Sequence, residues 1–377
     1  MSLTTSPITE ALVSGAAWLE PTARGLLPHR LPAWVTRQFP DPQLTAMEVQ
    51  PSGVIIGFRS SATRIELVSL PRRVTYAGAD RPRGRIDLVV DGVPVGTDLL
   101  TGGDSIHTDL QAGTSELIPG PPHVTRFADL GGDDKLIEIW LPHNEALELI
   151  SLATDMPVTA LEQTTPVWVH HGSSISHGSN AAGPSDIWPA VAARGACMRL
   201  RNLGFGGSAL LDPFMARVIR DAPADIISLK IGINIVNLDS MRLRTFVPAV
   251  HGFLDTIRDG HPSTPIMLIT PIFCGIHEDT PGPGSIDLAS LGTDQVRFIA
   301  TGEHGDTAQG RLTLRVIREA LAGIVATRQD AQLQLVDGLE LYGPDDATAL
   351  PLPDALHPDT ETHKLIGGRF IRHLARA

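Results

Sequence analysis

The feature that most constrains the fold of this chain is a change in the spacing of its apolar residues near residue 164. From about residue 45 to residue 161, apolar and polar side chains alternate, which is the pattern of β-strands with one face in water. The strands expected from this alternation span residues 54–59, 64–68, 85–90, 93–95 and 135–140. Asp91-Gly92 separates two of these runs and predicts a tight hairpin. Because no long amphipathic helix intervenes, residues 1–163 predict an N-terminal β-sandwich, or jelly roll.

After residue 164, short apolar runs alternate with segments of helical spacing, which is typical of an α/β fold. We expect strands at residues 167–170, 226–230, 266–270 and 332–336, and helices at 188–193, 246–259, 310–328 and 361–375. This alternation predicts a doubly wound parallel sheet with helices on both faces, over residues 164–377. Reactive residues of such sheets lie beyond the carboxyl ends of the strands.

Composition narrows the possible functions. The chain has 377 residues, enough for two domains, and its formal net charge is −12 without a run of Lys and Arg, so nucleic acid is a poor partner. Its two cysteines, Cys197 and Cys274, form no CxxC motif, which argues against disulfides and structural zinc. No apolar run is long enough for a membrane span, and residues 1–10 show no secretory pattern, so we expect a cytoplasmic protein.

A candidate nucleophile, Ser174, stands where the first parallel strand is expected to end. The sequence Gly172-Ser173-Ser174-Ile175-Ser176 follows an apolar run, and a serine at such a strand-to-helix turn is held toward solvent. The free N–H groups of the following helix could stabilise an oxyanion there. Taken alone, a turn rich in Gly and Ser is more often only a turn.

A candidate acid and base lie near the C-terminus. Asp354 and His357 are three residues apart, so they would share a face if they lay on one helical turn. The carboxylate could then orient the imidazole, and the imidazole could reach a serine on another loop. Most single Asp-x-x-His pairs are surface residues. A catalytic role for this pair is therefore supported only when it occurs together with the other motifs.

Two further motifs could supply donors to an oxyanion. Gly207 and Asn234 each lie at the end of an apolar stretch. The N–H of Gly207 and the amide of Asn234 could join the N–H of Ser174 in a three-donor oxyanion hole. A tight turn and a helix cap are the alternative interpretations of these two residues.

These blocks, in the order Ser174, Gly207, Asn234, then Asp354 with His357, resemble the SGNH or GDSL superfamily of hydrolases and acyltransferases. The resemblance covers the chain from about residue 166 to its end and implies a flavodoxin-like fold. It also implies that Ser174 is the nucleophile of a triad completed by Asp354 and His357. Ser174, Gly207 and Asn234 are then the oxyanion donors.

Two positions depart from the family pattern. Ser173 stands where the family usually has Asp, and Ile235 stands where an Asp often follows the oxyanion Asn. Neither change removes a catalytic group, although both weaken expectations about supporting hydrogen bonds. An α/β-hydrolase is disfavoured, because Ser176 occupies the place of the second glycine in Gly-x-Ser-x-Gly.

The two-domain layout resembles a subgroup of carbohydrate esterases and antibiotic-tailoring acyltransferases, most of all salicylyl-CoA acyltransferases of tetracycline biosynthesis. This resemblance implies transfer of an acyl group, salicylyl in that case, from acyl-CoA to a polyketide hydroxyl. The partners would be small molecules, with acyl-CoA as co-substrate and no permanently bound cofactor. Arg199, Arg201 and Arg297 are candidates for a local basic patch that binds the CoA phosphates.

Two alternatives remain. An esterase or deacetylase that hydrolyses O-acyl esters, for example of carbohydrates, would use the same catalytic residues. In a non-enzymatic protein, the β-sandwich would be a binding module and the second domain an inactive scaffold. All four motifs would then be present without a catalytic role.

Several other polar residues lie near the motifs. His171 and His177 flank the nucleophile, and Cys274 and His277 lie on a Gly/Pro-rich loop after a predicted strand, so all four are candidate substrate contacts. The histidines His170, His171 and His177 suggest a metal, but no third ligand follows in the helical spacing usual for hydrolytic zinc, so none is expected.

Overall fold

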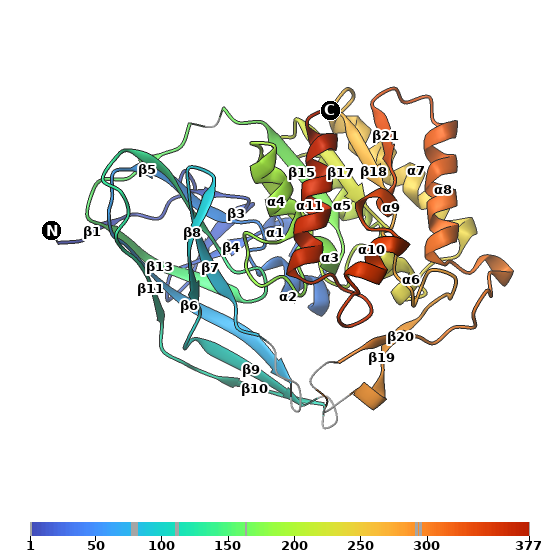
Figure 1. The fold of residues 1–377 in the computed structure, drawn as a ribbon, viewed down its shortest axis with the longest axis horizontal. Helices are drawn as coiled ribbons and strands as arrows, with labels where there is room; N and C mark the ends of the chain where they lie inside the picture. Colours follow the sequence, from blue (N-terminus) through green and yellow to red (C-terminus); the bar gives the residue numbers. More distant parts are fainter. Residues whose placement is uncertain are drawn as a thin grey trace. The chain divides into compact units, whose positions relative to one another are not determined.

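The computed structural model describes residues 2–76, 82–109, 113–162, 164–290, 293 and 296–376. It divides the chain into two compact units, and Figure 1 labels most of their elements. Unit 1 comprises Met1–Thr165, Ala182–Asp186 and Arg199–Asn202, and unit 2 comprises Pro166–Ala181, Ile187–Met198 and Leu203–Ala377. The boundary expected from the sequence falls at residue 163, outside the described residues. The sequence did not indicate that two short segments beyond it join unit 1.

Unit 1 contains two sheets within the described residues, as expected for a β-sandwich. One has eight strands in the order β10-β9-β6-β13-β4-β3, with β1 beside β13 and β11 beside β6. The other has six, in the order β14-β5-β12-β7-β8, with β2 beside β5. The strands are β1 Thr4–Ser6, β2 Val13–Ser14, β3 Trp18–Pro21, β4 Leu26–His29, β5 Ile55–Ser60, β6 Ile65–Tyr76, β7 Arg85–Val90, β8 Val93–Leu99, β9 Asp104–Asp109, β10 Thr114–Ile118, β11 His123–Phe127, β12 Lys135–Trp140, β13 Ala146–Thr154 and β14 Thr159–Ala160; the helices are α1 Ala33–Gln38 and α2 Pro42–Glu48.

The alternation in the sequence explains how the core of unit 1 forms. On the paired strands β5 and β12, Ile56 lies opposite Ile139 and Phe58 opposite Ile137, and all four side chains are fully buried. Such cross-strand pairs stabilise a sheet by excluding water from one face. The predicted hairpin forms between β7 and β8. Asp91 and Gly92 both have positive φ, 47° and 81°, as a two-residue hairpin turn requires.

Unit 2 is built on a five-stranded sheet in the order β16-β15-β17-β18-β21. The pairs β15·β17, β17·β18 and β18·β21 are parallel. Numbered along the sheet's own strands, this order is 2-1-3-4-5, which is the flavodoxin-like arrangement. The strands are β15 Val167–Gly172, β16 Arg199–Gly204, β17 Ile226–Lys230, β18 Ile266–Ile269 and β21 Leu333–Val336. The fold class predicted from the sequence, an α/β unit after a β-sandwich, is confirmed.

Helices cover both faces of this sheet (Figure 1). Trp168 of β15 packs on Trp188 of α4 and Phe370 of α11 on one face, and His171 stacks on Phe253 of α7 on the other. The helices are α3 Ser174–His177, α4 Trp188–Gly195, α5 Pro213–Arg220, α6 Ile233–Asn237, α7 Leu243–Gly260, α8 Leu314–Thr327, α9 Gly338–Leu341, α10 Pro344–Ala349 and α11 Thr360–Leu374. None of the helices in the described part of the chain has the length and apolar content needed to cross a membrane.

Candidate active site

The candidate nucleophile lies at the carboxyl end of β15. Ser174 is the first residue of α3, and the Ser173 hydroxyl caps this helix by accepting a hydrogen bond from Ile175 N (3.3 Å). Gly204 ends the neighbouring strand β16, and a Cβ at that position would come within 2.6 Å of His177 N. Glycine therefore lets β16 approach the nucleophile turn closely. The strand order places β15 between β16 and β17, so their carboxyl ends meet around Ser174.

Ser174, His357 and Asp354 form one hydrogen-bonded relay. His357 Nε2 lies 2.9 Å from Ser174 Oγ, and His357 Nδ1 lies 2.7 Å from Asp354 Oδ2. Because the carboxylate can only accept, Nδ1 carries the proton and Nε2 is left to accept the hydroxyl proton of Ser174. This is the geometry in which a histidine can act as general base toward a serine.

The Asp354 segment is a turn and not the helical turn expected from the sequence. Asp354 Oδ1 accepts hydrogen bonds from Leu356 N (2.9 Å) and His357 N (2.7 Å), and Ala355 has a positive φ of 67°. The aspartate side chain therefore closes a turn on its own following backbone, which brings it beside the imidazole. Asn180, which the sequence did not indicate, donates from Nδ2 to Asp354 Oδ2 (3.0 Å).

Electrostatics keep Asp354 ionised. Its side chain is only 13% exposed, and this burial by itself would raise the pKa. The hydrogen bond and charge of His357, with the two backbone N–H groups, outweigh burial and hold the pKa of Asp354 below its ordinary value. Asp354 is therefore a carboxylate at neutral pH and can stabilise an imidazolium.

The candidate oxyanion donors are the N–H groups of Ser174, Gly207 and Asn234. Asn234 Oδ1 accepts a hydrogen bond from Ala209 N (3.1 Å), which turns the Asn234 amide nitrogen the other way. Among the described residues, no acceptor is bonded to Ser174 N, Gly207 N or Asn234 Nδ2. Donors without an acceptor in the protein are what an oxyanion hole requires, and the oxyanion hole of Ser174, Gly207 and Asn234 stays a prediction.

Asn234→Ala is expected to lower kcat by about 10²- to 10³-fold, because one oxyanion donor typically has that effect. Steady-state kinetics would measure the loss. Asn237→Ala, the same substitution on the same helix, is the matched control and should change kcat by less than about tenfold. An Asn234→Ala enzyme with full activity would exclude Asn234 from the oxyanion hole.

The structure places His171 and His177 in the core and not at a pocket mouth. Their side chains are 1% and 4% exposed. His171 Nδ1 donates to Leu203 O (2.8 Å), and burial lowers the pKa of His171 to about 4. The expected contact of His171 with substrate is therefore wrong, because its ring is buried under α7, stacked on Phe253. His177 is also buried, at the end of α3.

Cys274 and His277 likewise have structural environments. Cys274 is 1% exposed and its thiol donates to Ala355 O (3.4 Å), while burial raises its pKa to about 12. His277 is fully buried, donates from Nδ1 to Thr280 O (3.1 Å), and has its pKa lowered by burial. Neither faces substrate as the sequence suggested. Cys274 instead supports the turn that carries the acid and the base.

A second Ser–His pair, Ser176 with His170, lies close to the nucleophile turn and was not identified from the sequence. His170 Nε2 lies 2.7 Å from Ser176 Oγ, and its Nδ1 lies 2.7 Å from Ser228 Oγ, which accepts from Trp168 Nε1 (2.8 Å). Burial, and next the charges of His171 and Lys230, lower the pKa of His170 well below its ordinary value. Since His170 and Ser176 are fully buried, this pair supports the α3 turn and cannot meet substrate.

No metal site is visible at these histidines. In the part of the chain that the structure describes, no three His, Cys, Asp or Glu side chains are grouped so that they could hold a metal ion.

Lowering the pH from 7 to 5 should destabilise the protein. Burial lowers the pKa of both His171 and His363 to about 4 in the folded state, so the unfolded chain, with a pKa near 6.5, binds more protons between these values. The free energy of unfolding should therefore fall by about 2 kcal/mol for each histidine. Denaturant titrations at the two pH values measure the fall.

The control for this pH effect is a matched pair of variants. His363→Gln should lose about 2 kcal/mol of this pH dependence, whereas His304→Gln, at an exposed position, should keep it. Equal unfolding free energies of the unsubstituted protein at pH 7 and pH 5 would contradict the assignment of neutral buried histidines.

Comparison with known proteins finds a family model that matches part of the chain. Residues 165–274 match the family model of GDSL-like lipases and acylhydrolases. The matched stretch contains Ser174, Gly207 and Asn234 and ends before Asp354 and His357. No curated protein sequence matches the chain.

Solved structures share the fold over the whole chain. A salicylyl-acyltransferase from a tetracycline biosynthetic pathway aligns with a TM-score of 0.81 and 24% identity, covering 99% of this chain and 97% of its own. A protein of Bacteroides ovatus described as a GDSL-like lipase aligns with a TM-score of 0.69 and 18% identity, covering 100% and 98%. An acetyl xylan esterase of the rumen bacterium Butyrivibrio proteoclasticus aligns with a TM-score of 0.55 and 10% identity, covering 100% and 98%.

The partial family match and the shared fold make this chain similar to enzymes of the GDSL/SGNH class. Within that class, the similarity to the salicylyl-acyltransferase extends over nearly the full length of both chains. The resemblance inferred from the sequence motifs is confirmed at this level. Acyltransferases and carbohydrate esterases share this fold, so the fold alone does not separate the two reactions.

Proposed function

We propose that this protein is a serine-dependent acyltransferase, which moves an acyl group from acyl-CoA to a hydroxyl through an acyl-Ser174 intermediate. The observation that carries the proposal is the relay of Ser174, His357 and Asp354, with the hydroxyl 2.9 Å from the imidazole. The full-length likeness to a salicylyl-acyltransferase, at a TM-score of 0.81 against 0.55 for the acetyl xylan esterase, favours transfer over hydrolysis.

In the first half of the proposed reaction, Ser174 Oγ attacks the thioester carbonyl as its proton passes to His357 Nε2. Asp354 stabilises the imidazolium that forms. The carbonyl oxygen, now an oxyanion, accepts hydrogen bonds from the N–H groups of Ser174, Gly207 and Asn234. When the tetrahedral intermediate collapses, the C–S bond breaks and the departing thiolate takes the proton from His357.

In the second half, an acceptor hydroxyl replaces the thiol. His357 takes its proton while its oxygen attacks the acyl carbon, and the imidazolium returns a proton to Ser174 Oγ as the ester leaves. Water in the acceptor's place gives the free acid. Transferase and esterase therefore differ only in what reaches the acyl-enzyme.

The proposed substrates rest on the acyltransferase likeness. A salicylyl donor and a polyketide acceptor are the first candidates, because the similar enzyme is a salicylyl-acyltransferase of a tetracycline pathway. Of the three arginines suggested for CoA phosphates, Arg199 and Arg201 are half-buried, and Arg199 donates to Thr165 O (3.1 Å). Arg297 is exposed just before β20, so it is the one of the three that we favour for this role.

The test is intact-protein mass spectrometry after mixing the enzyme with salicylyl-CoA or simple acyl esters, with and without hydroxylated acceptors. An adduct that a polyketide alcohol discharges faster than water does supports the transferase. Rapid turnover to free acid whatever the acceptor identifies an esterase, which the fold of the carbohydrate esterases makes the second candidate. Failure to form any adduct on Ser174 would overturn both.

A further inference from the structure

A long excursion of the chain between β18 and α8 carries a small hairpin beside the candidate active site. We call it the arm and define it as residues 275–290 and 296–313. It contains β19 Gly284–Ile286 and β20 Phe298–Ala300, which pair antiparallel, and two short 3-10 helices, Leu288–Ser290 and Ala308–Gly310. Figure 1 shows the hairpin leaving the layered body of unit 2.

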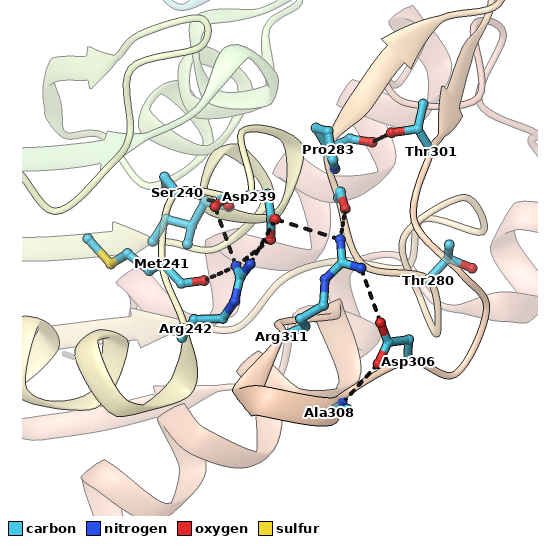
Figure 2. A network of polar contacts seen from close by, with 12 residues as sticks. Asp239, Ser240, Met241, Arg242, Thr280, Pro283, Thr301, Asp306, Ala308 and Arg311 are labelled. Atoms are coloured by element: carbon cyan, nitrogen blue, oxygen red, sulfur yellow. Dashed lines mark hydrogen bonds and ion pairs between the residues drawn. The ribbon is translucent and has the colours of Figure 1, made fainter.

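One side of the arm is fixed by an arginine (Figure 2). The Arg311 guanidinium donates to Gly282 O (2.6 Å) and to Asp306 (3.1 Å), and lies 3.6 Å from Asp239. Asp239 is held in turn by Arg242 (2.6 Å). Arg311 is 22% exposed, so these contacts are partly shielded from water and join both ends of the arm to the segment after α6.

The arm also packs directly on α6, the helix that carries Asn234. A Cβ at Gly282 would come within 1.8 Å of Val236 O, so only glycine permits this approach. Across the base of the hairpin, the N–H and the hydroxyl of Thr301 both donate to Pro283 O (2.9 Å each). The arm is therefore seated on the helix of the predicted oxyanion donor and is not a loosely tethered loop.

The other side of the arm contacts the turn of the acid and the base. Phe298 N donates to Asp354 O (2.8 Å). The Phe298 ring meets the His357 ring edge-on, with centroids 5.5 Å apart and planes at 78°. The arm thus connects two parts of the site, α6 and the Asp354–His357 turn, and the group that it presents to the imidazole is a phenyl ring.

The pleat of β20 separates this ring from its neighbours. Phe298 is half-buried, whereas Ile299, the next residue of β20, is 40% exposed. Since successive strand residues point to opposite faces, Ile299 points away from the imidazole that Phe298 meets. A phenyl ring can neither donate nor accept a conventional hydrogen bond, so it cannot hold a water molecule next to His357. It does offer a flat apolar surface to an aromatic acyl or acceptor group.

We propose that Phe298 is a specificity-determining residue, which disfavours water at the imidazole and so directs acyl-Ser174 toward an alcohol. The inference deepens the proposed function and rests on it. Transferases and esterases of this fold would then share the same catalytic relay, and the Phe298 side chain of the arm would favour transfer over hydrolysis. The quantity that Phe298 controls is the partition ratio, the amount of ester formed per free acid released at a fixed acceptor concentration.

The experiment compares partition ratios of single variants with salicylyl-CoA and a hydroxylated acceptor. Phe298→Ala should lower the ratio by about 10- to 200-fold, the range for loss of an apolar contact in a specificity pocket. Phe298→Leu should keep most of the ratio, because it remains apolar. The matched control Ile299→Ala changes the adjacent residue on the opposite face of β20 and should leave the ratio within about twofold of the unsubstituted enzyme.

The outcomes separate this inference from the proposed function. If acyl-Ser174 forms in the unsubstituted enzyme and transfers, but Phe298→Ala leaves the ratio unchanged, only the inference is wrong. If the unsubstituted enzyme yields free acid alone, the proposed transferase function fails and takes the inference with it. Thermal melting checks folding. Should Phe298→Ala unfold, Phe298→Tyr keeps the ring and adds a hydroxyl that can hold water, and an unchanged ratio in that variant would overturn the inference.

Discussion

Replacement of Ser174 by Ala should abolish the acyl-enzyme and lower turnover by about 10⁴- to 10⁶-fold, the cost typical of losing one member of a catalytic triad. The reason is that Ser173, Ser174 and Ser176 have different hydrogen-bond partners. Only Ser174 Oγ lies beside His357 Nε2, at 2.9 Å. The Ser173 hydroxyl is 1% exposed and caps α3, and the Ser176 hydroxyl is fully buried against His170.

Intact-protein mass spectrometry with an acyl-CoA measures the adduct, and steady-state kinetics measure the turnover. Ser173→Ala is the matched control, one residue away. It removes a helix cap and should cost about 0.5 to 2 kcal/mol of stability. The adduct should nevertheless form. An adduct that persists in Ser174→Ala, or that maps to a peptide position other than Ser174, would refute the assignment of the nucleophile.

The sequence predicted individual elements well, because their apolar spacing is local information. The strands expected at residues 85–90, 135–140 and 226–230 form with those bounds as β7, β12 and β17. The predicted sheet did not include β10, whose five residues are all exposed and which therefore has no buried face to mark it. The strand order of unit 1 could not be read from the sequence, since it depends on which apolar faces pack together. For unit 2 only the resemblance implied it, through the flavodoxin-like fold.

The site shows the same division. The triad and the oxyanion candidates could be named because their order along the chain resembles a family pattern. The substrate contacts could not. His170 and His171 are adjacent on β15 yet contact opposite faces of the sheet, so closeness to the nucleophile in sequence did not indicate access to substrate. Phe298 is far from His357 in the chain and meets it only because the arm folds back.

Asp354→Asn is expected to lower kcat by about 10⁴-fold while leaving the fold intact, as for the corresponding change in a serine-histidine-aspartate triad. The backbone N–H groups of the turn fix the orientation of the new side-chain amide. The atom at the Oδ1 position accepts from Leu356 N and His357 N, so it must be the amide oxygen. The amide NH2 then replaces Oδ2, where it faces His357 Nδ1 and the Asn180 amide.

An NH2 group in that place cannot accept the hydrogen bond that His357 Nδ1 donates to the carboxylate. The imidazole must accept there instead, which moves its proton to Nε2, and a protonated Nε2 cannot take the proton of Ser174. Asn180→Ala is the control, since it removes the other side-chain bond to Asp354 Oδ2 but leaves the carboxylate, and it should cost less than about tenfold. Single-turnover acylation, with thermal melting to confirm folding, measures both variants. If Asp354→Asn acylated within tenfold of the unsubstituted rate, the aspartate would not be setting the tautomer of His357, and the base would have to be oriented by another group.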